Sequence, residues 1–111
     1  MKKDEFLKEF TAGNNIQVYC KTNNEAKKFL KFLIENGVTE YLGGNKIDPT
    51  DEKKMYKFGG TYYQYLKVDS GPAEGFKNYN RDRIYSYGLE YGKSSHMYFS
   101  KKSISFSDIE M

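Results

Sequence analysis

The pattern of hydrophobic and polar positions is clearest between Ile16 and Val38. Ile16, Val18 and Cys20 alternate with more polar residues, and a period of two with β-branched members is typical of a half-buried strand. After Thr22 the period becomes helical. The apolar positions of the predicted helix are Ala26, Phe29, Leu30, Leu33 and Ile34. We therefore expect a strand that leads directly into an amphipathic helix.

Short polar signals mark both ends of this helix. Thr22 and Glu25 have the T-x-x-E spacing of a capping box, in which the threonine oxygen accepts from the amide of Glu25 and the glutamate reaches back to the amide of Thr22. Asn36-Gly37 ends the helix because glycine adopts the left-handed conformation without a steric penalty, and Val38 is placed to close back on the last turn. Phe32 lies off the apolar face, so it is either covered by another element or exposed.

The other segments carry shorter patterns. Residues 1–12 fit one or two helical turns, and residues 46–57 have no sustained period and are expected to form a loop. Further strands are expected at residues 39–42, 61–68, 84–91 and 96–100, and a last short one from Ile104 to near Asp108. The predicted fold class is α+β, with one principal helix packed on a curved antiparallel sheet of about four to six strands. We expect residues 1–111 to form a single domain.

Composition adds one anomaly and several limits. The chain has 11 Tyr and 8 Phe but no Trp, which favours β structure and supplies large side chains with polar tips. The net charge of +3 permits an acidic protein or nucleic-acid partner without requiring one. The single Cys20 excludes an intramolecular disulfide, and neither a signal-peptide pattern nor a long apolar run is present. These features predict a cytoplasmic protein with no membrane segment.

Groups for catalysis or metal binding are sparse. Cys20 and His96 are the only thiol–imidazole pair, and Cys20 lies on the inward phase of its strand, so we interpret it as a structural thiol. One Cys with one His falls short of a zinc site, and Asp48, Asp51 and Glu52 lack calcium-loop spacing. The segments 43–46 and 59–61 lack the spacing of a phosphate-binding loop and are interpreted as turns. We therefore expect no enzyme, no cofactor and no metal.

The tyrosine-rich strands are the predicted binding surface. The helix half is accounted for by folding, with Lys27, Lys28 and Lys31 on its solvated side, so the site is expected in the second half. The candidate binding residues are Tyr63, Tyr65, Tyr85 and Tyr87, with Arg81 and Arg83 at the rim. These tyrosines could simply cover the sheet, form a protein-binding face, or stack the bases of a single strand.

The run from Val18 to Gly37 resembles small accessory proteins carried by bacteriophages and prophages of low-GC Gram-positive bacteria. Those proteins share a V-x-C-x-T-x-x-E-A-x-x-F-L-x-x-L-x-x-x-G run. The matching positions are Val18, Cys20, Thr22, Glu25, Ala26, Phe29, Leu30, Leu33 and Gly37. Residues 104–108 are similar to their C-terminal strand and Ser-Asp, whereas Tyr41 stands where relatives carry Trp.

The resemblance implies a phage accessory protein that acts in the cytoplasm of the bacterial host. Small phage proteins of this kind often bind host proteins stoichiometrically, including CRISPR–Cas effectors and other defence components. The leading hypothesis is thus an anti-defence, anti-CRISPR-like inhibitor that binds a host defence protein. The alternatives are a single-stranded nucleic-acid-binding accessory protein and a protein that sequesters a nucleotide signal.

Overall fold

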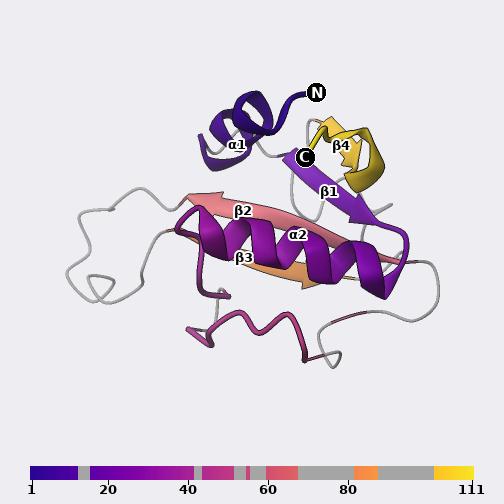
Figure 1. The fold of residues 1–111 in the computed structure, drawn as a ribbon. Helices are drawn as coiled ribbons and strands as arrows, with labels where there is room; N and C mark the ends of the chain where they lie inside the picture. Colours follow the sequence, from indigo (N-terminus) through magenta and orange to yellow (C-terminus); the bar gives the residue numbers. More distant parts are fainter. Residues whose placement is uncertain (13–15, 42–43, 52–54, 56–59, 68–81, 88–101) are drawn as a thin grey trace.

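The computed structural model describes residues 1–12, 16–41, 44–51, 55, 60–67, 82–87 and 102–111; of residues 66, 67, 82, 85 and 87 it describes the backbone alone. Its elements, in chain order, are α1 (Lys3–Thr11), β1 (Ile16–Cys20), α2 (Asn23–Glu35), β2 (Thr61–Lys67), β3 (Asp82–Tyr87), β4 (Lys102–Ser105) and the 3-10 helix η3 (Phe106–Asp108). The fold is α+β, as the sequence predicts (Figure 1).

The passage from β1 into α2 follows the predicted local signals. Thr22 is the N-cap, and its hydroxyl oxygen accepts from the amide of Glu25 at 3.2 Å. The return bond differs from the expectation, because Glu25 Oε1 accepts from the amide of Lys21 at 2.9 Å rather than from that of Thr22. The glutamate therefore ties the end of the strand to the first turn of the helix.

The C-terminal end of α2 is also confirmed. Gly37 has a φ of +89°, and its amide donates to the carbonyl of Ile34, while the amide of Val38 donates to that of Leu33 at 2.9 Å. These two bonds form a Schellman motif. Val38 is buried, so the chain closes back on the last turn as expected.

The sheet is mixed rather than antiparallel, and here the sequence-based prediction is wrong. Its order is β3-β2-β1-β4; β1 and β3 each pair antiparallel with β2, but β4 runs parallel to β1. The parallel direction sets Ile104 beside Val18 and carries the chain on so that Phe106 reaches α2, with its ring 6.1 Å from that of Phe29. The 3-10 helix therefore packs on α2 through this aromatic contact.

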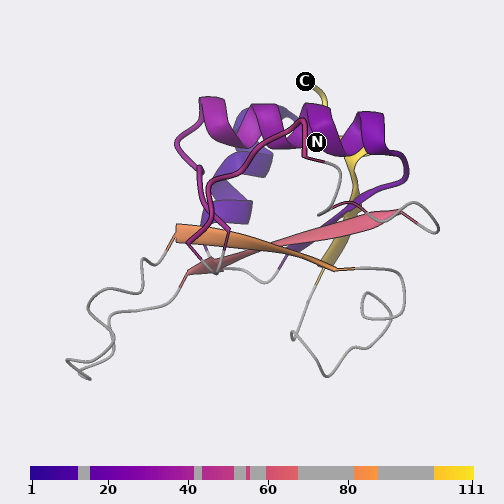
Figure 2. The same cartoon turned by 90° about the horizontal axis from the view of Figure 1, so that it is seen from below.

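Both helices cover the same face of the sheet (Figure 2). Helix α1 is a full element of nine residues, so the description of one principal helix was too narrow. It is held by Phe6 and Phe10, which are buried and stack with ring centroids 5.2 Å apart. Phe32 of α2 is half-buried, with its ring 6.3 Å from that of Phe6. Of the two possibilities for Phe32, the structure shows that another element covers it.

Of the predicted strand at residues 39–42, the described residues 39–41 form isolated bridges and no regular strand. Tyr41 forms a parallel bridge with Ile84, and Glu40 forms an antiparallel bridge with Lys46. The amide of Ile84 donates to the carbonyl of Glu40 at 3.2 Å. The predicted strand at 96–100 lies outside the described residues.

Candidate functional site

Two of the predicted binding tyrosines lie in the core. Tyr63 is 0% exposed and Tyr65 is 5% exposed, so the prediction of an exposed surface at these positions is wrong. Tyr63 stands opposite Val18 and Tyr65 opposite Ile84 in the sheet register, on the face that the helices cover. Their rings lie 5.6 Å from those of Phe29 and Phe10, respectively. Large rings at these positions fill the space beneath the helices and leave no surface for a partner.

Burial also suppresses the acidity of the groups around Tyr63. Desolvation, then the nearby Tyr41 and Cys20, raise the pKa of the Tyr63 hydroxyl, which has no hydrogen-bond partner among the described residues. Desolvation, followed by the charge of Glu25, raises the pKa of the Cys20 thiol. Cys20 is 0% exposed. A buried thiol whose ionisation is suppressed is a poor nucleophile, which agrees with its interpretation as structural.

Arg83 has a structural contact instead of a rim position. Its guanidinium forms an ion pair with Glu40 at 3.0 Å, and its side chain is 13% exposed. This pair fastens the segment before Gly44 to the edge of β3. In the same segment, desolvation and then the carboxylates of Asp51 and Asp48 raise the pKa of Tyr41 to about 12.

The other candidates are placed only in part. The backbones of Tyr85 and Tyr87 pair with Gln64 and Tyr62 in the sheet, and their side chains are outside the description. Arg81 lies outside the described residues. Among the members of the predicted set whose side chains are described, Tyr63, Tyr65 and Arg83 do not form one exposed surface.

A second tyrosine pair lies on the face of the sheet opposite the helices. Tyr19 and Tyr62 are half-buried cross-strand neighbours, with ring centroids 4.9 Å apart. Gly60 makes room for the Tyr19 ring, since a Cβ at this glycine would stand 2.5 Å from Tyr19 Cε1. Desolvation and the neighbouring Tyr19 raise the pKa of Tyr62. The pair therefore has a packing role over the glycine.

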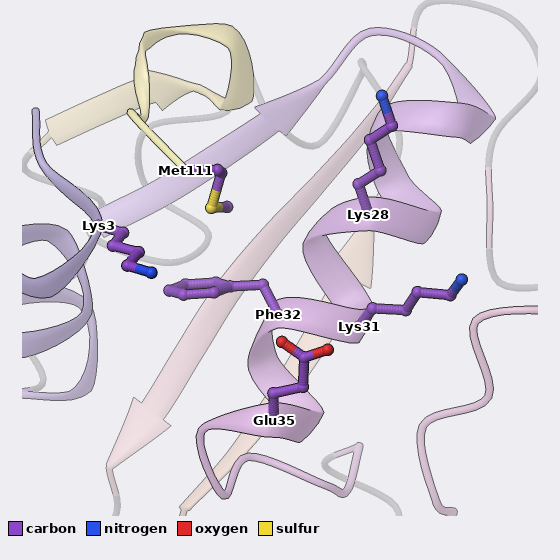
Figure 3. Close-up of a pocket in the computed structure, with 6 residues that line it drawn as sticks. All are labelled: Lys3, Lys28, Lys31, Phe32, Glu35 and Met111. Carbon is purple, nitrogen blue, oxygen red and sulfur yellow. The ribbon is translucent and has the colours of Figure 1, made fainter.

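The structure adds a site that the sequence analysis did not select. A pocket of about 310 Å³ opens between α1, α2 and the C-terminal segment (Figure 3). Its lining residues are Lys3, Lys28, Lys31, Phe32, Glu35 and Met111. Phe32 and Met111 form an apolar floor, and Lys3 lies beside the Phe32 ring on the side of α1. Lys28, Lys31 and Glu35 follow at helical spacing along α2.

The two ends of the chain hold the wall opposite α2. The amide of Lys3 donates to the carbonyl of Glu110 at 3.1 Å, and the amide of Glu110 donates to that of Met1 at 2.8 Å. These bonds join residues that are far apart in sequence and fix Lys3 and Met111 at the same pocket. The wall is therefore set by backbone hydrogen bonds and not by side chains alone.

The charge of the pocket is unbalanced. Within the described part of the chain, Lys3, Lys28 and Lys31 form no ion pair, whereas Lys102 on β4 lies 3.7 Å from the carboxylate of Glu9. All three pocket lysines are exposed, and Glu35 is the only acidic residue of the lining. Such a site attracts an anionic group that also presents apolar surface.

One signal in the sequence pointed to this pocket. Phe32 departs from the apolar face of its helix and stands next to Lys31, one turn after Lys28. An aromatic residue that follows two lysines, off the apolar face of its helix, is a signal for a contact with another element. Lys3 and Met111 had no such signal, because only the tertiary fold brings them to α2.

Comparison with known proteins leaves the chain unassigned to a family. No protein-family model, no curated protein and no solved structure matches it. None of the described helices is both long and apolar enough to cross a membrane. The chemistry of the pocket is therefore the main guide to function.

Proposed function

We propose that this protein is a stoichiometric protein-binding module whose binding site is the pocket between α1 and α2. The observation that supports the proposal most strongly is the chemistry of the lining, in which exposed lysines without ion-pair partners among the described residues surround an apolar floor. An acidic protein surface would compensate these charges and bury Phe32 and Met111 in the same event.

Nucleic acid fits this pocket less well. A phosphate chain that follows Lys28 and Lys31 would also meet the carboxylate of Glu35 in the next turn of the helix. Base stacking needs an accessible ring face, and the Phe32 ring is already half-buried against α1. Tyr63 and Tyr65, two of the four tyrosines named for base stacking, are in the core. Nucleic acid and a nucleotide remain as contrary outcomes of the experiment below.

The kind of partner comes from the resemblance of residues 18–37 to phage accessory proteins. A small protein of that class would act in the cytoplasm of the bacterial host by occupying a surface that a defence protein needs, for example on a CRISPR-associated effector. Inhibition by occupancy is stoichiometric and requires no catalytic group. A compact pocket with a lysine rim would suit an acidic patch on such a protein.

The test is affinity capture from a lysate of a Gram-positive host with three forms of the protein. These are the wild type, the pocket variant Lys28→Glu/Lys31→Glu, and the control Lys8→Glu/Lys46→Glu. The control makes the same change in net charge at exposed lysines outside the pocket. We expect the wild type and the control to retain the same protein and the pocket variant to lose it.

The retained material is analysed for protein, nucleic acid and nucleotide across a range of salt concentrations. A protein complex with an apolar anchor should respond modestly to salt, whereas phosphate-driven binding weakens linearly and steeply on a log–log plot. Capture of nucleic acid or nucleotide in place of protein, or equal capture by the pocket variant, would contradict the proposed function.

A further inference from the structure

We infer that the pocket receives a single apolar side chain that is flanked on both sides by carboxylates, presented by an acidic segment of the partner protein. This inference rests on the proposed function and specifies the ligand of the same site. It follows from three features of the pocket: its size, the placement of its lysines on α1 and on α2, and the single acidic side chain at one end.

The size of the floor sets the apolar part of the ligand. About 310 Å³ is at the lower end of the range for ligand sites, and enough for one large aliphatic or aromatic side chain. Phe32 offers the exposed part of a ring that is held against Phe6, so it forms a rigid base. Met111 is 54% exposed, and its flexible thioether can adapt to the shape of the guest.

The lysines determine where the ligand should carry its carboxylates. Lys3 lies on the α1 side of Phe32 and points toward its ring, while Lys28 and Lys31 come from α2 and extend away from the ring (Figure 3). Positive charge therefore lies at the α1 edge and at the α2 edge of the pocket. Neither wall is neutralised by an ion pair within the described residues. A guest with one carboxylate on each side of its apolar side chain would satisfy both walls together.

Glu35 determines the orientation in which the acidic segment should bind. It lies on the same face of α2 as Lys28 and Phe32, at the C-terminal end of that row. A carboxylate placed there would meet a like charge, which is unfavourable, so the acidic residues of the guest should cluster toward Lys28 and Lys3. A neutral or basic residue of the guest should face Glu35.

The experiment uses fluorescence anisotropy with the full-length protein and short labelled peptides. The test peptide has a central leucine with glutamates on both sides; one control replaces the leucine with serine, and another replaces the glutamates with glutamine. We expect the test peptide to bind and each control peptide to bind at least about tenfold more weakly, since each lacks one of the two features.

Protein variants show whether binding occurs in this pocket. Lys28→Glu/Lys31→Glu and Met111→Ser should each weaken the test peptide by at least about tenfold, and Lys8→Glu/Lys46→Glu should not. A peptide with lysines in place of the glutamates should bind Lys28→Glu/Lys31→Glu better than it binds the wild type. The three residues changed, Lys28, Lys31 and Met111, are exposed, so these variants should fold.

Three results would overturn the inference. The serine peptide could bind as well as the leucine peptide, which would mean that the pocket recognises the charge of the peptide alone. An oligonucleotide of equal charge, or vesicles that contain anionic lipid, could bind more tightly than the peptide and depend on the same lysines. The peptides could all fail to bind while capture of the protein partner still depends on Lys28 and Lys31, in which case the proposed function stands and this ligand is wrong. Failure of the proposed function itself appears as capture that the pocket variant does not alter.

Discussion

The sheet-facing side of α2 and its outer side differ in what their residues contact. On the sheet-facing side, Phe29, Leu30 and Leu33 are 0% exposed and lie in the core. On the outer side, Lys28 and Lys31 are exposed and line a pocket with Phe32 at its base. The difference shows that one short helix separates the requirements of folding from those proposed for binding. Substitutions on the two sides should therefore have separable effects.

The largest expected effect is loss of stability on the sheet-facing side. Leu33→Ala should lower the free energy of unfolding by roughly 2–5 kcal/mol, because it removes buried methyl groups and leaves a cavity. Lys31→Ala, two positions earlier on the outer side, should change it by less than about 0.5 kcal/mol. Urea unfolding followed by circular dichroism measures both. An equal free energy of unfolding for Leu33→Ala and the wild type would contradict the assignment of the sheet-facing side to folding.

Two glycines extend the comparison from the helix to the sheet beneath it. Both have left-handed φ angles, +81° for Gly60 and +89° for Gly37, but a Cβ at Gly60 would lie 2.7 Å from the carbonyl oxygen of Cys20, whereas a Cβ at Gly37 meets nothing within 4 Å. Gly37→Ala should cost only the backbone strain, about 1–2 kcal/mol. Gly60→Ala should cost roughly 2–5 kcal/mol, since overpacking adds to the strain. Thermal unfolding of both variants gives the comparison, and similar melting temperatures would contradict it.

The cap of α2 should give a smaller effect. Thr22→Ala removes the acceptor for the amide of Glu25 and should lower stability by about 0.5–2 kcal/mol, whereas Thr22→Ser keeps the acceptor and should be nearly neutral. Binding at the pocket should be unchanged in the folded fraction of either variant. Chemical denaturation of the two variants beside the wild type measures the difference, and two indistinguishable curves would mean that the capping bond is not formed.

The smallest expected effect of pocket binding is on the reactivity of the Cys20 thiol. Burial raises the pKa of its thiol, so the folded protein should react with a thiol reagent far more slowly than the protein in urea. Saturating the pocket with the acidic peptide should not expose this thiol, because Cys20 lies on β1 in the core beneath α2. Rapid labelling of the native protein would show that the core beneath α2 is open.

Local signals in the sequence were sufficient for much of the fold. The alternation of Ile16, Val18 and Cys20, the cap at Thr22 and the stop at Gly37 each depend on neighbours within a few residues, and the structure confirms them. The parallel direction of β4 accompanies instead a contact of Phe106 with Phe29, which lies far from it in the sequence. Such a contact cannot be inferred from the pattern of hydrophobic positions in the strand itself.

The candidate site was harder to predict for the same physical reason. Alternation divides the residues of β2 between two faces but does not say which face the helices cover, and Tyr63 and Tyr65 lie on the covered one. The pocket combines α2 with Lys3 and Met111, which meet only because the first and last segments of the chain are hydrogen bonded. Phe32 was the single local signal, and its meaning depended on that tertiary contact.

The most direct test of the proposed binding site is isothermal titration calorimetry, in which the captured partner protein is titrated into the wild type and into Lys28→Glu/Lys31→Glu. The account predicts a defined stoichiometry with the wild type and at least about a hundredfold weaker binding by the pocket variant, about tenfold for each reversed charge, with an unchanged melting temperature. Equal affinity for the two proteins would contradict the assignment of the outer side of α2 as the binding site.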